Sequence, residues 1–132
     1  MKKCNCCSGL AYQKCCQPYL SGRSKPNTAE ALMRSRFTAF ARKKTNYIKK
    51  TVKLPASSGF VNLDLSKDNS VWVKLEIIDK LKGSFKDDYG EVEFKAYYKE
   101  NESSRDILFI HERSIFHKIN GSWFYVDKKD FS

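Results

Sequence analysis

The chain has 132 residues, of which 41% are hydrophobic and 14% aromatic. This composition excludes an intrinsically disordered chain, and the length fits one domain with a small appendage. Lysine and arginine number 25 against 15 aspartate and glutamate, a formal charge of +10, so an anionic partner such as RNA or an acidic protein face would suit it. No stretch approaches the roughly 20 apolar residues of a membrane span, and we expect a cytoplasmic protein.

All five cysteines lie near the start of the chain, in a C-x-C pair with one added cysteine and a later C-C pair: Cys4, Cys6, Cys7, Cys15 and Cys16. So short a segment cannot bury enough apolar surface to fold by itself, and clustered thiolates suit a tetrahedral Zn²⁺. We predict a zinc knuckle in which Cys4, Cys6, Cys15 and Cys16 are the ligands. Four thiolates leave no position for water, so the site would be structural, with Cys7 as a bystander.

A second interpretation of the cysteines is a thiol redox switch. Cys6–Cys7 and Cys15–Cys16 are neighbours in sequence and would form strained rings. Cys4 and Cys7 have the C-x-x-C spacing but are not followed by a predicted helix. In a cytoplasmic protein a disulfide framework is rare, and five cysteines cannot all pair within one chain.

A connector rich in turn-forming residues follows the knuckle, from Pro18 to Pro26. We therefore divide the chain into a knuckle, residues 1–22, and a body, residues 23–132. If the two are independent, removal of zinc unravels about the first 20 residues and leaves the body folded.

The body begins with a predicted helix from Asn27, as N-cap, to about Lys43, with Glu30 placed to complete a capping box. Apolar residues recur along it at steps of three and four: Ala29, Met33, Phe37, Phe40 and Ala41. Thr45 can cap a second helix, which Pro55 prevents from continuing.

The second half of the chain alternates apolar and polar residues, as strands do. Four segments show this pattern: residues 71–77, 92–98, 105–119 and 122–126. Asn120-Gly121 is a strong hairpin signal between the last two. Helices first and a meander afterwards predict an α+β fold, with helices packed on one face of a curved four-stranded antiparallel sheet.

Two sets of motifs resemble a known family. Cys4-x-Cys6-x-Ser8-Gly9-x-x-Tyr12-x-x-Cys15-Cys16 is similar to the SEC-C motif, the zinc-binding tail of the SecA translocation ATPase. The later motifs resemble the YchJ family; they are Thr28 to Phe40, Tyr47, His111-Glu112-Arg113-Ser114 and Trp123 to Asp127.

This resemblance implies a SEC-C knuckle joined to a cystatin-like cone of the nuclear-transport-factor-2 type, and it implies no reaction. SEC-C knuckles on SecA-like proteins engage a chaperone or the ribosome, so the resemblance implies a protein partner, or the ribosome and its RNA, for the knuckle and the basic surface. The chain departs from the patterns at Cys7, where SEC-C motifs have glycine, and at Leu20, near which YchJ-like chains often have histidine.

A pocket in the cone is the alternative site, for a small-ligand-binding domain or an enzyme. Its candidate polar residues are Arg34 and Arg36 from the first helix and His111 and Arg113 from the third strand. Strand alternation places His111 and Arg113 on one face and their neighbours Glu112 and Ser114 on the other. The simpler interpretation is a buried hydrogen-bond network between helix and sheet, so we expect a protein that is not an enzyme.

Four aromatic residues also allow two interpretations: Trp72, Tyr97, Trp123 and Tyr125. Between lysines they resemble a platform on which nucleic-acid bases stack. Aromatic residues on alternating strands more often form a core or cross-strand pairs, and we favour that interpretation.

Overall fold

The computed structural model describes residues 2–129. Its four strands are β1 (Val71–Lys82), β2 (Tyr89–Lys99), β3 (Leu108–Ile119) and β4 (Ser122–Lys129). They form one antiparallel sheet in the order β1-β2-β3-β4, which confirms the predicted meander. Within residues 2–129, no helix is both long and apolar enough to cross a membrane.

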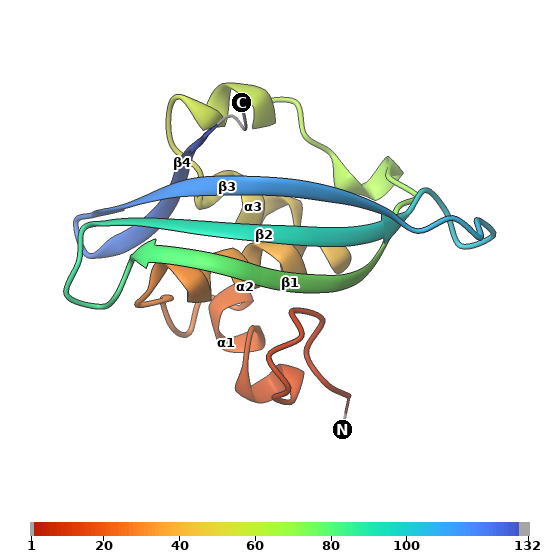
Figure 1. Cartoon of the computed structure of the whole chain (residues 1–132), viewed down its shortest axis with the longest axis horizontal. Coiled ribbons are helices and arrows are strands. Elements are labelled where there is room, and N and C mark those ends of the chain that lie inside the picture. The colour runs from red at the N-terminus through yellow and green to blue at the C-terminus, as the bar shows by residue number, and fades with distance from the viewer. Residues whose placement is uncertain (1, 130–132) are drawn as a thin grey trace.

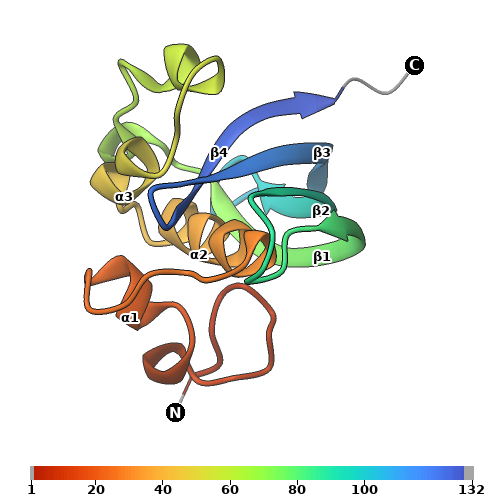
Figure 2. The ribbon, with the colours of Figure 1, turned by 90° about the vertical axis from the view of Figure 1, so that its left-hand side faces the viewer.

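The helices precede the sheet and lie on one of its faces (Figures 1 and 2). They are α1 (Gln17–Leu20), α2 (Ala29–Ala41) and α3 (Thr45–Lys50), with short 3₁₀ helices η1 (Tyr12–Lys14), η2 (Ala56–Phe60) and η3 (Leu65–Lys67). The sheet curves around α2, and the N-terminal segment lies below α2 (Figure 2). The predicted α+β fold, with helices packed on a curved four-stranded antiparallel sheet, is confirmed.

The helix starts differ from the prediction by one residue. Thr28, not Asn27, is the N-cap of α2, because its hydroxyl accepts a hydrogen bond from Ala31 N at 3.0 Å. Glu30 makes no capping box and instead pairs with Arg34 and Lys80. Thr45 is the first residue of α3 rather than its cap, and its hydroxyl accepts a hydrogen bond from Leu65 N in η3.

Helix α2 is buried on more than one side. The sheet covers the face that carries Met33 and Phe37, α3 covers Ser35, and the N-terminal segment covers Thr38. The buried set therefore includes polar residues that a two-sided pattern assigns to solvent. The central helix joins three parts of the molecule.

A β-bulge changes which residues of β1 face the helices. Trp72 pairs with Tyr98 and Lys74 pairs with Tyr97, so Val73 is an extra residue on β1. Trp72 packs edge-on against Phe37, and Val73 is 45% exposed. A single inserted residue inverts the faces on one side of it, so Val73 does not share the inward face of the buried Leu75 as strict alternation along β1 would require.

Two glycines let the β1–β2 hairpin touch the start of α2. Ala29 N donates to Gly83 O at 2.9 Å. A Cβ at Gly83 would lie 2.8 Å from Ala29 Cβ, and one at Gly90 would lie 2.6 Å from Gly83 Cα. Neither position has room for a side chain, so the hairpin and the helix meet backbone to backbone.

The other hairpin follows the sequence signal. Asn120 and Gly121 have φ of 51° and 82°, the pair of positive values that a two-residue primed turn needs. The turn joins β3 directly to β4 in register, Ile119 opposite Ser122.

The N-terminal segment shares its core with the body. Cys4, Cys6 and Cys16 are each at most 4% exposed and belong to the same buried cluster as Leu32 and Phe116. The segment is thus packed on the body rather than held away from it, and the division at residue 22 stays a prediction about how independently the two parts fold.

Candidate metal centre

Four sulfur atoms converge beside α2. The Sγ atoms of Cys4, Cys6, Cys15 and Cys16 all lie within 4.8 Å of one another. Two of these cysteines precede a tight loop and two follow it, and the loop closes where Cys4 N donates to Leu10 O at 2.8 Å. The structure therefore brings together the four residues predicted as ligands.

The spacing of the sulfurs fits a tetrahedral metal ion. Zn–S bonds of about 2.3 Å in a tetrahedron separate the sulfurs by about 3.8 Å. Cys15 Sγ lies 3.6 Å from Cys6 Sγ and 3.9 Å from Cys16 Sγ. No disulfide joins cysteines in the described part of the chain. This set can hold a metal ion.

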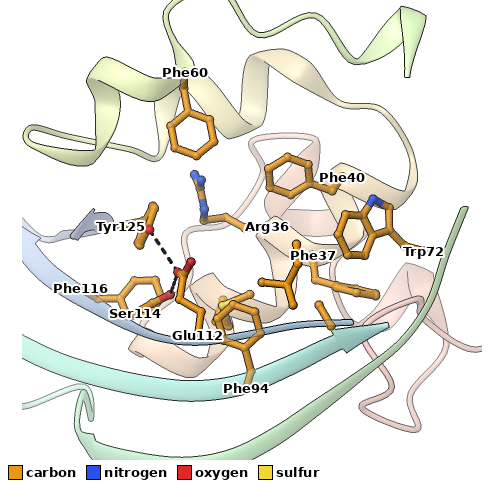
Figure 3. Close-up of a pocket in the computed structure, with 13 residues that line it drawn as sticks. Arg36, Phe37, Phe40, Phe60, Trp72, Phe94, Glu112, Ser114, Phe116 and Tyr125 are labelled. Atoms are coloured by element: carbon orange, nitrogen blue, oxygen red, sulfur yellow. Dashed lines mark hydrogen bonds between the residues drawn. The ribbon is translucent and has the colours of Figure 1, made fainter. Parts of the chain in front are cut away.

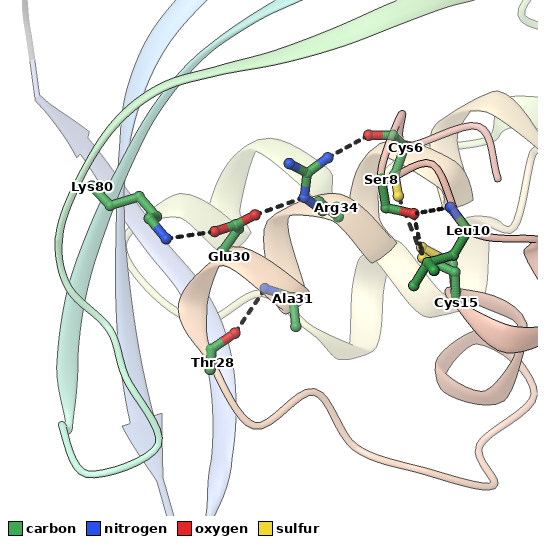
Figure 4. Close-up of polar contacts among 10 residues, drawn as sticks. Cys6, Ser8, Leu10, Cys15, Thr28, Glu30, Ala31, Arg34 and Lys80 are labelled. Carbon is green, nitrogen blue, oxygen red and sulfur yellow. Dashed lines mark hydrogen bonds and ion pairs between the residues drawn. The ribbon is translucent and has the colours of Figure 1, made fainter.

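Two hydroxyl groups contact the sulfurs from outside the cluster. Ser8 Oγ lies 3.1 Å from Cys15 Sγ and also accepts a hydrogen bond from Leu10 N (Figure 4). Thr38 Oγ1 donates to Cys16 Sγ at 3.3 Å and lies 3.6 Å from Cys4 Sγ. Hydroxyl donors spread the negative charge of thiolates and fix their orientation, as outer partners of metal ligands do.

The electrostatics of the cluster favour a cation at its centre. Burial raises the pKa of Cys15 to about 11, against the hydrogen bond with Ser8 that lowers it. Hydrogen bonding with Cys4 holds the pKa of Cys16 above its usual range, and the same contact lowers the pKa of Cys4. Four thiols this close cannot all ionise by themselves, whereas a divalent ion at their centre would offset two of the four negative charges and favour the thiolate form.

A chain of polar contacts links the cluster to the sheet (Figure 4). Lys80 on β1 pairs with Glu30 at 2.8 Å, and Glu30 pairs with Arg34 one turn later on α2, also at 2.8 Å. Arg34 Nη1 then donates to Cys6 O at 2.6 Å. Arg34 thus joins the N-terminal segment to the helix, and it reaches the sulfur cluster through the backbone of Cys6.

Cys7 lies outside the sulfur cluster. Its φ of 65° is in the left-handed region that favours glycine, which gives a physical reason for the glycine that SEC-C motifs have here. Its thiol is exposed, and Leu75 N of β1 donates to its Sγ at 3.5 Å. The turn keeps the glycine-like conformation although it carries a side chain.

The four candidate pocket residues are not brought together. Arg34 lies at the knuckle, as described above. His111 and Arg113 lie on the sheet face away from α2, where both contact Glu93, at 2.7 and 3.1 Å. Arg36 alone of the four lines the cavity between α2 and the sheet. Glu112 and Ser114 also line this cavity (Figure 3). They lie on the opposite face of β3 from His111.

The environment of Arg36 combines burial and aromatic contact. The side chain is 4% exposed, and its Nη1 donates to Ile48 O at 2.9 Å and to Thr51 Oγ1 at 2.7 Å. Its guanidinium lies 5.5 Å from the ring centroid of Phe60 and 5.1 Å from that of Tyr125. Burial lowers the pKa of Arg36 to about 10, so the group remains charged at neutral pH.

The four aromatic residues do not form one platform. Trp123 is 2% exposed, and Trp72 packs against Phe37 and Tyr98 on the helix side. Tyr125 packs against Phe116, whereas Tyr97 pairs with Phe109. Three of the four therefore take part in packing around the core and cavity.

The sequence did not indicate that Thr38 contacts the cysteine sulfurs. It placed Glu112 on the strand face opposite His111 and Arg113, and the pocket was expected on the face of those two residues. Thr38 had one signal, a hydroxyl one residue from the apolar line of the helix. The alternation along β3 was predicted correctly, but the cavity lies on the face of Glu112 and not on that of His111 and Arg113.

Comparisons with known proteins show the family to which the chain belongs. A family model described as the middle, NTF2-like domain of YchJ matches residues 28–128. The chain belongs to the YchJ family. A UPF0225 protein from Corynebacterium glutamicum is 39% identical over 124 residues, which cover 94% of each protein. One from Actinobacillus succinogenes is 35% identical over 127 residues, which cover 94% of this chain and 79% of the relative.

Two solved structures resemble this YchJ-family chain, and both are described as proteins containing a SEC-C motif. The solution structure from Rhodopseudomonas palustris has a TM-score of 0.81 and 28% identity, covering 98% of both chains. The crystal structure from Psychrobacter arcticus has a TM-score of 0.71 and 34% identity, covering 95% of this chain and 76% of that one.

Proposed function

We propose that this YchJ-family protein binds one Zn²⁺ through Cys4, Cys6, Cys15 and Cys16, and that the resulting knuckle docks on an acidic protein. The observation that carries the proposal is the convergence of four sulfurs within 4.8 Å of one another. The SEC-C motif in both structural neighbours agrees with it. The role of the metal would be structural, since four protein ligands fill a tetrahedron.

Zinc is preferred to other metals that four thiolates accept. Tetrahedral sulfur sites select zinc or iron. The four thiols belong to one chain, lie close around one point, and are partly shielded by Thr38 and Ser8, as in a single-ion structural site. A reducing cytoplasm would keep the thiols available to the metal.

Docking is supported by the charge and shape of the knuckle. Residues 1–29 contain five lysines and arginines and no aspartate or glutamate. Leu10 is 54% exposed, and with Lys14 it lines a shallow hollow beside Cys15. An apolar side chain among cations suits a protein partner with an acidic rim better than it suits a phosphate backbone.

Metal analysis tests the first half of the proposal. Purified protein should contain about one zinc ion per chain by elemental mass spectrometry. It should also be colourless, because Zn²⁺ has a filled d shell. Cys16→Ser should lose the tightly bound metal, whereas Cys7→Ser, a matched change one loop away, should keep it. Visible absorption with bound iron, or full zinc in Cys16→Ser, would contradict the proposed site.

A charge-reversal pair tests the second half. A photo-crosslinking residue at position 10 should capture a defined protein, and Lys3→Glu with Lys14→Glu should abolish that capture. Lys49→Glu with Lys50→Glu, the same charge change on α3, should leave it intact. Raising the salt concentration should weaken the complex. Capture that nuclease treatment removes would assign the surface to RNA, and the acidic-protein proposal would then be wrong.

A further inference from the structure

The cavity between α2 and the sheet is the second candidate site, and it is unrelated to the metal. Its volume is about 240 Å³. Seven aromatic side chains from α2, η2 and all four strands form its walls: Phe37, Phe40, Phe60, Trp72, Phe94, Phe116 and Tyr125 (Figure 3). Close-packed interiors contain few voids larger than a water molecule, and an apolar cavity of about 150 Å³ already binds benzene. A compound of one or two rings would fit this cavity.

One end of the cavity is polar. Glu112 Oε2 accepts hydrogen bonds from Ser114 Oγ and, at 3.1 Å, from Tyr125 OH. Within residues 2–129, its other oxygen, Oε1, has no hydrogen-bond donor, and Arg36 uses Nη1 alone for its hydrogen bonds. An acceptor and a set of donors are therefore left at the same end of the cavity.

Arg36 and Glu112 do not pair with each other directly. Among the described residues, no ion pair joins them, although both line the cavity. Buried charges are normally paired or hydrogen-bonded, so a group that bridges them would be stabilised there. Because one charge is positive and the other negative, a charged ligand would leave an excess charge in an apolar site, and a neutral ligand would not.

The cavity also has an entrance. Ile110 on its rim is 43% exposed, and Phe40, Phe60 and Glu112 are half-buried. Flat aromatic walls accept a planar ring by stacking or edge contact.

From these observations we propose that the cavity binds a small, uncharged, planar ring compound whose edge carries a hydrogen-bond donor beside an acceptor, as in a cyclic amide. The donor faces Glu112 Oε1, the acceptor faces the free N–H groups of Arg36, and the ring lies between the aromatic walls.

The probe for this proposal is 2-quinolone, a two-ring cyclic amide, titrated calorimetrically into the zinc-loaded full chain. It should bind at one site per chain. 1-Methyl-2-quinolone lacks the donor and should bind at least about 10-fold more weakly, as expected for the loss of a hydrogen bond to a charged group. Quinoline-2-carboxylate, which is charged, should also bind more weakly. No binding of 2-quinolone, or equal binding of the three compounds, overturns the proposal.

Two variants locate the binding. Glu112→Gln keeps the shape of the side chain but presents an amide donor in place of a carboxylate oxygen, so 2-quinolone should bind about 10-fold more weakly. Glu93→Gln, the same change on the opposite face of the sheet, should have no effect. Ala96→Leu extends into the cavity from β2 and should abolish binding while the chain stays folded. Unchanged binding in Ala96→Leu overturns the assignment to this cavity, even if Glu112→Gln fails to fold.

Discussion

The two sides of α2 are held by different kinds of contact. On the sheet side, large apolar groups such as Phe94 and Phe116 pack against the helix and line the cavity. On the knuckle side, small sulfur-bearing side chains meet the hydroxyl of Thr38, and Arg34 reaches the backbone of Cys6. The sheet side depends on apolar area, whereas the knuckle side would depend on the proposed ion, which would hold the four sulfurs together. We call the sheet side of α2 the stable side, because it needs no ligand, and the knuckle side the conditional side, because its packing would depend on a bound ion.

Removing the metal should give the largest difference in stability between the two sides of α2. With a chelator, residues 2–22 should become sensitive to protease while the amides of the sheet stay protected from exchange. The melting temperature should fall by about 10 °C, or roughly 3 kcal/mol in a domain of this size, because three ligand cysteines are part of the body's core. An unchanged melting temperature would mean that the knuckle is energetically separate, and loss of the whole sheet would remove the distinction.

Phe116→Ala should damage the stable side. This fully buried side chain on β3 packs against Tyr125, and its loss should destabilise the protein by about 3–5 kcal/mol in denaturant unfolding. Phe109→Ala, at a position 54% exposed on the same strand, is the control and should have a much smaller effect. At low temperature Phe116→Ala should still bind one metal ion per chain, and loss of the metal from the folded variant would contradict the comparison.

Thr38→Val should damage the conditional side. It keeps the volume of the side chain but removes the hydroxyl that contacts two sulfurs, so metal affinity should fall by about 10- to 100-fold in a chelator competition. Thr51→Val removes another buried hydroxyl, one that bonds Arg36 instead of sulfur. Equal losses of metal affinity in the two variants would show that the effect is general instability.

Arg34→Met should loosen the contact between the sides. It removes the side-chain donor to the Cys6 carbonyl and one of the two cations that pair with Glu30, and it should cost about 1–2 kcal/mol of stability. Lys80→Met removes only the more exposed ion pair with Glu30 and should change stability by less than about 1 kcal/mol. If Arg34→Met and Lys80→Met lose the same stability, the hydrogen bond from Arg34 to the Cys6 carbonyl contributes nothing to stability.

Cys7→Gly should have the smallest effect. Glycine accepts the positive φ without strain but raises the entropy of the unfolded chain, and the two effects offset each other to within about 1 kcal/mol. The metal content should stay at one ion per chain. If Cys7→Gly loses the metal, Cys7 is a ligand and the proposed set of four ligands is wrong.

Features encoded by a few neighbouring residues could be predicted from the sequence. Asn120-Gly121 specifies its own turn, and the cysteine pairs specify a cluster whatever the body does. The bulge at Val73 could not be predicted, because it depends on the pairing of β1 with β2. The contacts of Thr38 with sulfur and the separation of Arg36 from Arg34, His111 and Arg113 also depend on packing between distant segments, which periodicity in one element does not contain.

The contact of the β1–β2 hairpin with the start of α2 has a consequence for the metal. Because Gly83 and Gly90 press on Ala29 without side chains between them, the helix has no freedom to shift along its axis. A slip of one residue would turn α2 by about 100° and carry Thr38 and Arg34 away from the sulfurs. Two glycines beside the start of α2 thus help to set the angular position of the groups that contact the four sulfurs.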